Sequence, residues 1–431
     1  TALVTDGSGA LSFAAVGAEL YAANTTGSTD PTASGTLGLA IGSSASANGS
    51  SSVAIGDTAL ANSTYSVAIG RQADGSQTGA ISIGNSATAT GYYGVAIGSD
   101  ASAYQYGVAL GRYAKTGTSS QYSVSLGYAY ASGANSFATG ITQNTSPYGA
   151  TGANSIAMGY LARATGSYSI ALGYTPYSTG LRSTAIGRSY AGGTDGFAAA
   201  IGSNSNTYGA QGETSVAMGY LSKATADYTS AIGLTCQATA VGSTAIGQYG
   251  QASGVASLVL STDTIGTGTQ ATAHSSIAIG SNSKSATIGK IAHSPKRFAA
   301  NGDAQGGIFV LLADTTDATA TALTSNNAAV AADNQIVAAS DTCITFDGTI
   351  TAMQNGAQAY ASWRIEGLLV NDGGTTTLAN SATTVIQNLS SWGMALTADN
   401  TNNALAITCT GEASHNIRWV ANIRTTEVTY A

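Results

Sequence analysis

The chain has 431 residues, of which 8% are charged and 43% are hydrophobic, and its formal net charge is -7. Disordered chains combine high charge with few apolar residues, so this composition predicts a folded protein built from small side chains. The acidic balance disfavours nucleic acid and anionic membrane surfaces as partners, because both attract clusters of Lys and Arg. The longest strongly apolar run, Ile308 to Ala313, is far shorter than the roughly 20 residues of a membrane-spanning helix, so we expect no membrane insertion.

Residues 1–36 are rich in Gly, Ser and Thr and are expected to form a leader or linker into the region that follows. One strand is expected near Leu11 to Val16. A chain that opens at Thr1 is expected to be trimmed or to start inside a longer polypeptide.

A repeat of 14 residues dominates positions 37–289, as in Val53-Ala54-Ile55-Gly56 followed by Val67-Ala68-Ile69-Gly70. A weaker, Ala-rich half such as Ala87-Thr88-Ala89 completes each unit. A helix would need apolar residues three and four apart and would not tolerate so much Gly, whereas alternating β-branched residues are typical of strands. Each unit is therefore predicted to form one coil of a parallel β-solenoid. The repeat glycines are expected to need positive φ or close backbone approach; they are Gly42, Gly56, Gly70, Gly84, Gly98, Gly159, Gly173, Gly187, Gly219, Gly233, Gly247 and Gly280.

So narrow a coil is expected to enclose its Val, Ile and Leu side chains together with Ala. One chain then offers too little apolar area to offset the entropy of ordering it. Solenoids bury surface by stacking, and a thin solenoid gains more by packing against copies of itself. We therefore predict a parallel homotrimer around one axis.

The period slips at four places, and extra residues in a solenoid form loops that often carry the binding face. Two polar insertions, residues 142–153 and 203–214, are the candidate receptor contacts, with Asn144, Tyr148, Asn204, Asn206 and Tyr208 as the candidate residues. The chain also has 22 Tyr against 6 Phe. Tyr suits an edge that is half apolar and half wet, so these rings would pack in seams between chains or stack on sugars.

Residues 290–300 carry Lys290, Lys296 and Arg297, break the period and are expected to form a neck. Residues 301–431 show longer alternating strands separated by turn signals, which predicts an antiparallel β-sandwich or jelly roll. Seven strands are expected there, at Ile308–Leu312, Gln335–Ala338, Cys343–Ile350, Ala359–Val370, Thr383–Leu389, Leu405–Cys409 and Ile417–Val428. Trp363, Trp392 and Trp419 are expected to anchor its core, with ligand stacking as the alternative. Whether Cys343 and Cys409 pair is left open.

The sequence shows no catalytic constellation. The histidines, His274, His293 and His415, stand far apart, and none has a second His or Cys at metal-ligand spacing. Glycosidases need paired carboxylates in a cleft, whereas the acids of the repeat region are isolated. We therefore predict no cofactor, no metal and no enzymatic activity, and a tailspike-type hydrolase is the least favoured alternative.

The repeats resemble the head of trimeric autotransporter adhesins, the YadA-like left-handed parallel β-roll. The resemblance rests on Ser52-Val53-Ala54-Ile55-Gly56, Ser66-Val67-Ala68-Ile69-Gly70 and Ser276-Ile277-Ala278-Ile279-Gly280, and it spans residues 37–290. It implies a homotrimer with a display or adhesion role.

The rest of the chain resembles phage fibres. The C-terminal region is similar to a β domain at the ends of phage tail fibres, and Leu3 to Phe13 is similar to fibre linker units. The matching C-terminal stretches are Gly302 to Gln305, Thr315 to Thr319, Trp363 to Gly367, Thr410 to Ala413 and Ile417 to Ala421.

These resemblances together predict an extracellular virion fibre, such as a tail fibre. Its N-terminal end would meet other virion or appendage proteins, and it would display a region that binds a host-surface glycan or protein. No heptad pattern follows Gly289, which disfavours the first alternative, an adhesin head at a bacterial cell surface. A purely architectural spacer of a capsid or appendage is the second alternative.

Overall fold

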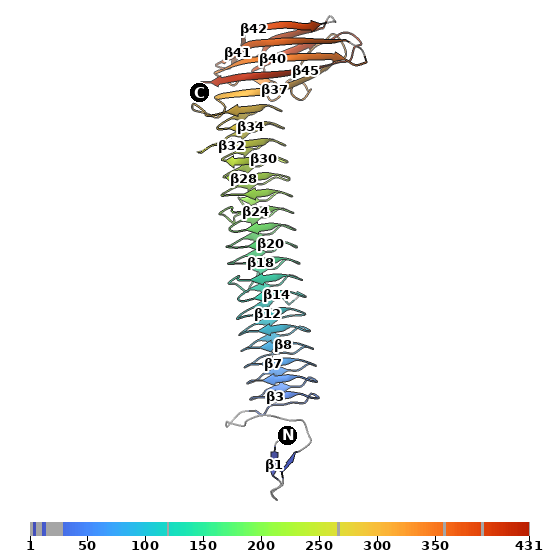
Figure 1. Ribbon diagram of the computed structural model, residues 1–431, viewed down its shortest axis with the longest axis vertical. Helices are drawn as coiled ribbons and strands as arrows, with labels where there is room; N and C mark the ends of the chain where they lie inside the picture. The colour runs from blue at the N-terminus through green and yellow to red at the C-terminus, as the bar shows by residue number, and fades with distance from the viewer. Residues whose placement is uncertain are drawn as a thin grey trace. The chain divides into compact units, whose positions relative to one another are not determined.

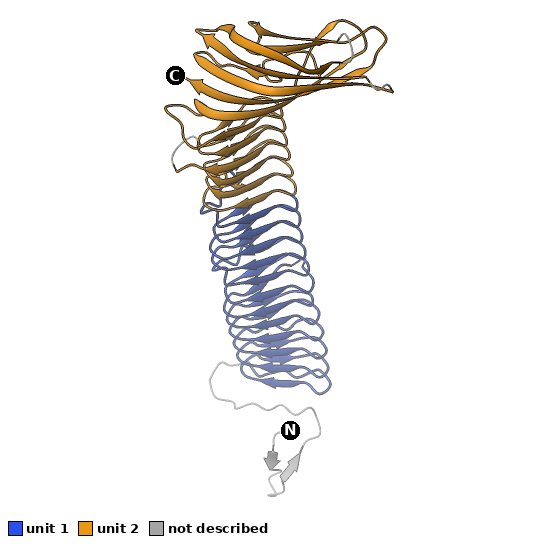
Figure 2. Cartoon of the chain, turned by 45° about the horizontal axis from the view of Figure 1, so that its top comes forward, with its two compact units in different colours: residues 1–206 blue, residues 207–431 orange. Residues whose placement is uncertain are grey.

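The computed structural model describes residues 29–430 except 119, 265–267, 357–358 and 389–391, together with strands β1 (Leu3–Thr5) and β2 (Leu11–Phe13), which pair antiparallel. Its contacts divide it into two compact units, residues 1–206 and 207–431 (Figure 2). The described residues contain strands and turns, and none forms a helix that could cross a membrane.

In the first unit, each coil contributes a three-residue strand to a long parallel sheet, and most coils add a two-residue strand on a second side (Figure 1). In one coil Asp74 takes the place of the short strand and forms isolated bridges to Leu60 and Thr88. The long-sheet strands are β3 (Leu39–Ile41), β5 (Val53–Ile55), β7 (Val67–Ile69), β8 (Ile81–Ile83), β10 (Val95–Ile97), β12 (Val108–Leu110), β14 (Val124–Leu126), β16 (Phe137–Thr139), β18 (Ile156–Met158), β20 (Ile170–Leu172), β22 (Thr184–Ile186) and β24 (Phe197–Ala199). The short strands are β4 (Ser46–Ala47), β6 (Leu60–Ala61), β9 (Thr88–Ala89), β11 (Ser102–Ala103), β13 (Lys115–Thr116), β15 (Tyr130–Ala131), β17 (Gly149–Ala150), β19 (Arg163–Ala164), β21 (Tyr177–Ser178) and β23 (Tyr190–Ala191).

The second unit begins with further coils of the same kind. Their long-sheet strands are β26 (Val216–Met218), β28 (Ser230–Leu234), β30 (Thr244–Gln248), β32 (Leu258–Thr262), β34 (Ile277–Gly280) and β36 (Ile291–Ser294). Their short strands are β25 (Gly209–Ala210), β27 (Lys223–Ala224), β29 (Gln237–Ala238), β31 (Gln251–Ala252), β33 (Gln270–Ala271) and β35 (Lys284–Ser285). The prediction of an all-β parallel solenoid is thus confirmed.

Each coil is filled by its smallest residues, and this corrects one expectation. The middle residue of the long-sheet strand points inward and is fully buried, as at Ala54, Ala96 and Ser125. The flanking Val, Ile and Leu point outward and are half-buried or exposed, as at Val53 and Ile55. The narrow coil of about 14 residues takes mostly Ala and Ser at this inward position, with Val259 of β32 as the larger exception, so most Val, Ile and Leu side chains of these strands face outward.

The repeat glycines lie where a coil turns toward its second strand. All those predicted have positive φ, from 72° at Gly187 to 137° at Gly84. At Gly98 an added Cβ would lie 2.4 Å from the backbone oxygen of Gly111 in the next coil, so the close stacking itself requires Gly. Most coils also place non-Gly residues in the left-handed region, such as Thr58 (φ 53°) and Asp100 (φ 55°).

The solenoid of the second unit continues into the segment expected to be a neck. Strand β36 pairs in parallel with β34, with Ile291 opposite Ile277, so the 14-residue register persists there instead of breaking. Residues 298–300 then turn around Asp303, whose carboxylate accepts the backbone N–H groups of Phe298 (2.9 Å), Ala299 (2.6 Å) and Ala300 (2.7 Å).

The remainder of the second unit is a two-sheet antiparallel sandwich. One sheet has the order β37 (Ala304–Thr315), β45 (Ile417–Thr429), β40 (Thr342–Gln354), β41 (Tyr360–Asp372), β42 (Thr375–Asn388). In the other, β38 (Ala320–Ala322), β39 (Ile336–Val337) and β43 (Gly393–Asp399) all pair with β44 (Ala404–Thr410). The core lies between the sheets and includes Phe309, Phe346, Ile365, Ile407 and Trp419. Strands β38 and β43 were not expected from the sequence.

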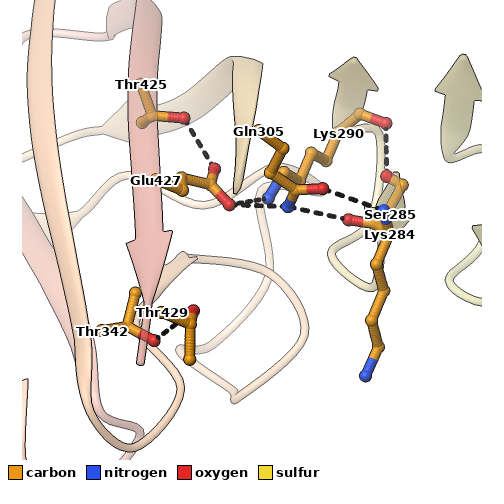
Figure 3. A network of polar contacts seen from close by, with 8 residues as sticks. All are labelled: Lys284, Ser285, Lys290, Gln305, Thr342, Thr425, Glu427 and Thr429. Carbon is orange, nitrogen blue, oxygen red and sulfur yellow. Dashed lines mark hydrogen bonds and ion pairs between the residues drawn. The ribbon is translucent and has the colours of Figure 1, made fainter. Parts of the chain in front are cut away.

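A buried polar network joins the last coil of this unit to the sandwich (Figure 3). Lys290 Nζ lies 2.6 Å from Glu427 Oε2, and each side chain is only 7% exposed. The same carboxylate accepts Gln305 Nε2 at 2.8 Å and Thr425 Oγ1 at 2.7 Å. Gln305 also exchanges hydrogen bonds with the backbone of Lys284. The network therefore ties strands β37 and β45 to the solenoid through side chains as well as backbone.

Candidate functional site

The outer surface of the long sheet carries two columns of mostly large apolar side chains, which we call the apolar face; in the first unit Thr184 interrupts one column and Thr139 the other. In the first unit, one column contains Val53, Val67, Ile81, Val95, Val108, Val124, Phe137, Ile156, Ile170 and Phe197, and the other contains Ile41, Ile55, Ile69, Ile83, Ile97, Leu110, Leu126, Met158, Leu172 and Ile186. Parallel register stacks each side chain on its equivalent in the next coil.

The apolar face is partly open to solvent. Ile97, Leu110, Met158 and Ile186 are 36% to 41% exposed. In the second unit, Met218, Ile246 and Leu260 occupy the equivalent strand position, with 38% to 41% exposure. A contiguous exposed apolar surface of this extent marks an interaction site.

Tyrosines gather along the turns rather than on the apolar face. Tyr93, Tyr106 and Tyr122 occupy equivalent turn positions in the first unit, and their rings stack with centroids 5.8 and 4.9 Å apart. Tyr160 and Tyr174 stack at 5.2 Å at another turn. Stacking covers part of each ring, yet Tyr93 and Tyr122 remain 55% and 57% exposed. They still suit either of the expected roles, seam packing or contact with sugars.

The first insertion is anchored by the residues that we proposed as receptor contacts. Asn144 Nδ2 donates to the backbone oxygen of Tyr113, 31 positions earlier, at 3.3 Å. The ring of Tyr148 is half-buried and lies 4.4 Å from the guanidinium of Arg163. Both side chains hold the loop in place, so the residues left facing solvent are Thr142 and the stretch 145–147.

The part of the second insertion that lies in the first unit is also anchored by an Asn side chain. Asn204 Nδ2 donates to the backbone oxygen of Thr175 at 3.1 Å, 29 positions earlier, and Asn206 is exposed. In the second unit, Tyr208 is half-buried. Ile141 and Ile201, which open the two insertions, are fully buried. An Ile followed by Asn three positions later was a signal in the sequence for this anchoring.

The sandwich buries all three Trp side chains in its core. Trp363 and Trp419 stack with centroids 5.5 Å apart, Trp392 packs on Trp419 at 5.8 Å, and the indole of Trp419 donates to Thr315 Oγ1. Each is at most 3% exposed, so none is available to stack on a ligand.

Cys409 is buried in the same core and Cys343 is exposed, and the two do not form a disulfide. Burial raises the pKa of the Cys409 thiol to about 12, so it is not a reactive group.

Three cavities open on the outer surface of the β37–β45–β40–β41 sheet. One, of about 750 Å³, lies beside Asp314, Met353 and Arg418. Two others, of about 490 and 420 Å³, lie beside the ion pair of Arg424 and Asp347, whose Nη2 and Oδ2 atoms are 2.7 Å apart. All three cavities are lined by charged groups, and the cavities of about 750 and 420 Å³ also have apolar side chains in their linings.

Metal-binding geometry is not found among the described residues. No group of three or more His, Cys, Asp or Glu side chains there could hold a metal ion. Asp263 is the one buried acid of the repeat region in that part of the chain. Burial raises its pKa, but hydrogen bonds from Ser281 and Thr269 outweigh burial and hold the pKa below its usual range. Its oxygens are saturated by these donors, so it is a structural carboxylate.

The fold and its outer surface define a structural repeat protein with an exposed apolar face. A family model described as the YadA head domain repeat matches residues 33–59, 47–73, 76–101, 150–175, 210–234 and 265–283. The chain therefore carries YadA head domain repeats, as the sequence motifs predicted, and its solenoid is of the adhesin-head type. No curated protein matches the chain. The resemblance of the C-terminal region to phage tail-fibre domains stays a prediction.

Proposed function

We propose that the protein is a homotrimeric virion fibre, such as a tail fibre, that displays a receptor-binding region to the host surface. The observation that carries the trimer is the apolar face, two columns of Val, Ile, Leu, Met and Phe that run along the long sheet. YadA-type heads are homotrimeric adhesins, so the repeats support the same assembly.

Energetics favour covering this face. At about 25 cal/mol per Å², covering roughly 50 Å² on each of two side chains stabilises the assembly by about 2.5 kcal/mol per coil. The gain recurs at each coil that has two large outward side chains, so identical chains in parallel register would associate along their apolar faces. In a parallel assembly, each coil of one copy lies level with the same coil of its neighbours, because every copy has the same spacing between coils.

Analytical ultracentrifugation of the full chain tests the assembly. We expect a mass three times that of the 42.4 kDa chain. Replacing Ile97 and Leu110 together by Asp places charges on the apolar face and is expected to weaken association, because burying an unpaired carboxylate is costly. Ser102→Asp, on the short strand β11 of the coil that contains Ile97, is the control and should stay trimeric. A monomeric wild-type chain would refute the proposal.

The adhesive role is proposed for the exposed parts of the two insertions and for the C-terminal domain. We propose residues 1–36 as the particle-proximal leader, 37–289 as the rod, 290–300 as the neck and 301–431 as the tip. Loop exposure supports binding at the insertions, since Thr145, Ser146, Asn204 and Asn206 all face solvent. A host-surface glycan or protein is the expected ligand.

Exchange of the solvent-facing residues tests this role. Replacing residues 145–147 and 205–206 by Gly and Ser, with Asn144, Tyr148 and Asn204 kept as anchors, should reduce attachment of the purified protein to host cells. The matched control replaces residues 117–121, at another slip of the period. Unchanged attachment of the exchanged protein would favour a purely architectural spacer, and identification of its neighbours in the native particle would separate a virion fibre from a bacterial surface adhesin.

A further inference from the structure

The outer surface of the sandwich is a regular array of side chains. Strands β37, β45, β40 and β41 pair in register, so their outward residues form six rows of four across the sheet. The rows run from Ala304, Val428, Cys343 and Val370 at one end to Asp314, Arg418, Met353 and Tyr360 at the other. We call these rows the tip face.

The tip face continues the apolar face of the second unit without a break. Ile291 ends one apolar column, and in the antiparallel pair of β36 and β37 it stands directly opposite Ile308. Directly opposed residues of an antiparallel pair project from the same side of the sheet. Whatever covers the apolar face near Ile291 therefore meets Ile308 and the tip face next.

Composition of the tip face is that of a protein interface. Five large apolar side chains on it, Ile308, Val310, Met353, Val420 and Val428, are 42% to 62% exposed. Charged residues stand among them in equal numbers of each sign: Arg364, Arg418 and Arg424 with Asp314, Asp347 and Glu366. Interfaces combine apolar contacts with Arg and usually involve about 20 to 30 residues on each side, which six rows of four can supply.

We propose that a second copy of this chain covers the tip face, so that the chains associate through their sandwiches as well as through their solenoids. This inference rests on the proposed trimer. The balanced charges suit a partner that carries the same balanced set, and they give no net attraction for a polyanion or a polycation. Tyr360, in the last row, is the one aromatic side chain in these rows, which disfavours stacked sugars as the occupant. The three cavities give room for side chains of the second copy.

The native thiol of Cys343 reports on this contact. It lies in the first row of the tip face and is exposed in the single chain, whereas Cys236 and Cys409 are buried. The experiment measures the rate at which a maleimide labels Cys343 in the full native chain, alongside sedimentation of the same sample. Val420→Asp places a charge on the tip face, and Val385→Asp is the control on strand β42, outside the rows. Tryptophan fluorescence verifies that each variant keeps its folded core.

We expect maleimide to label Cys343 about tenfold more slowly in the trimeric wild-type chain and in the trimeric Val385→Asp variant than in the Val420→Asp variant. Labelling of a covered thiol requires local opening of the contact. Rapid labelling of Cys343 in a wild-type trimer would overturn this inference alone. Slow labelling that persists in Val420→Asp, or that is lost equally in Val385→Asp, would also overturn it. A monomeric wild-type chain would overturn the proposed trimer as well, and the sedimentation mass distinguishes that result.

Discussion

Breaking the buried ion pair of Lys290 and Glu427 should destabilise the sandwich more than removing an ordinary hydrogen bond. Glu427→Gln replaces the carboxylate by a neutral amide and leaves the ammonium of Lys290 buried without a counter-charge. Removing one partner of such a pair costs about 3–5 kcal/mol. We expect Lys290→Met to cost a similar amount, since it leaves the carboxylate with only the neutral donors Gln305 and Thr425.

A double-mutant cycle isolates the ion pair. The variant that combines Lys290→Met with Glu427→Gln buries no charge at this site, and replacing both partners of a buried pair is often close to neutral. We therefore expect the double variant to be more stable than either single variant, with a coupling energy of about 3 kcal/mol.

Urea unfolding followed by tryptophan fluorescence measures these free energies, because Trp363, Trp392 and Trp419 all lie in the sandwich core. Protomer concentration is held constant throughout, since association shifts apparent stability. Thr342→Val is the matched control. It removes the hydrogen bond between the uncharged hydroxyls of Thr342 and Thr429 (2.8 Å) and should lower the free energy of unfolding by about 0.5–1.5 kcal/mol. If the loss in free energy of unfolding of the double variant equals the sum of the losses of the two single variants, the reasoning is refuted.

Three further predictions concern the solenoid and its end. Gly98→Ala, whose Cβ would lie 2.4 Å from a backbone oxygen, should lower the melting temperature more than Gly127→Ala, where nothing lies within 4 Å. Ala96→Leu should prevent native assembly, because Ala96 is fully buried inside a coil without space for added methylenes; an unchanged circular dichroism melt would contradict this. Burial raises the pKa of Asp303, but three backbone N–H groups outweigh it and hold the pKa below its usual range. The stability that Asp303 supplies should therefore be present above about pH 4 and be lost as pH falls further, so Asp303→Asn should destabilise the chain at pH 7 and by progressively less in acid. An equal destabilisation at pH 7 and pH 2.5 would show that the lowered pKa contributes nothing.

Prediction from sequence succeeded where structure is local and repeated. Val53 to Gly56 and its successors recur at a fixed spacing, and stacked coils must place equivalent residues side by side, so both the strands and their register follow from the period. The turn glycines could be named for the same reason. In the sandwich, strands such as β40 and β45 were foreseen from their alternation, but β38 and β43 were not, because short or Ala- and Thr-rich strands carry little pattern.

Contacts between distant residues were beyond this kind of prediction. Lys290 and Glu427 are 137 positions apart, and their pairing depends on how β45 packs against the last coil. The continuation of the solenoid through β36 was missed because Ile291-Ala292-His293-Ser294 lacks the repeat Gly. Asn144 and Asn204 were identified as notable residues, but their anchoring role depends on carbonyl groups two coils away.

The sequence by itself determined that this chain forms a β-solenoid of short strands, with Val and Ile sharing one side and Ala the other, because side chains alternate along a strand. Only the tertiary structure decided which side faces inward. Closing a coil of about 14 residues brings opposite strands so near that small residues, chiefly Ala and Ser, fill the space between them, and most of the larger side chains face outward. The surface on which the proposed function depends is therefore a consequence of the small diameter of the coil.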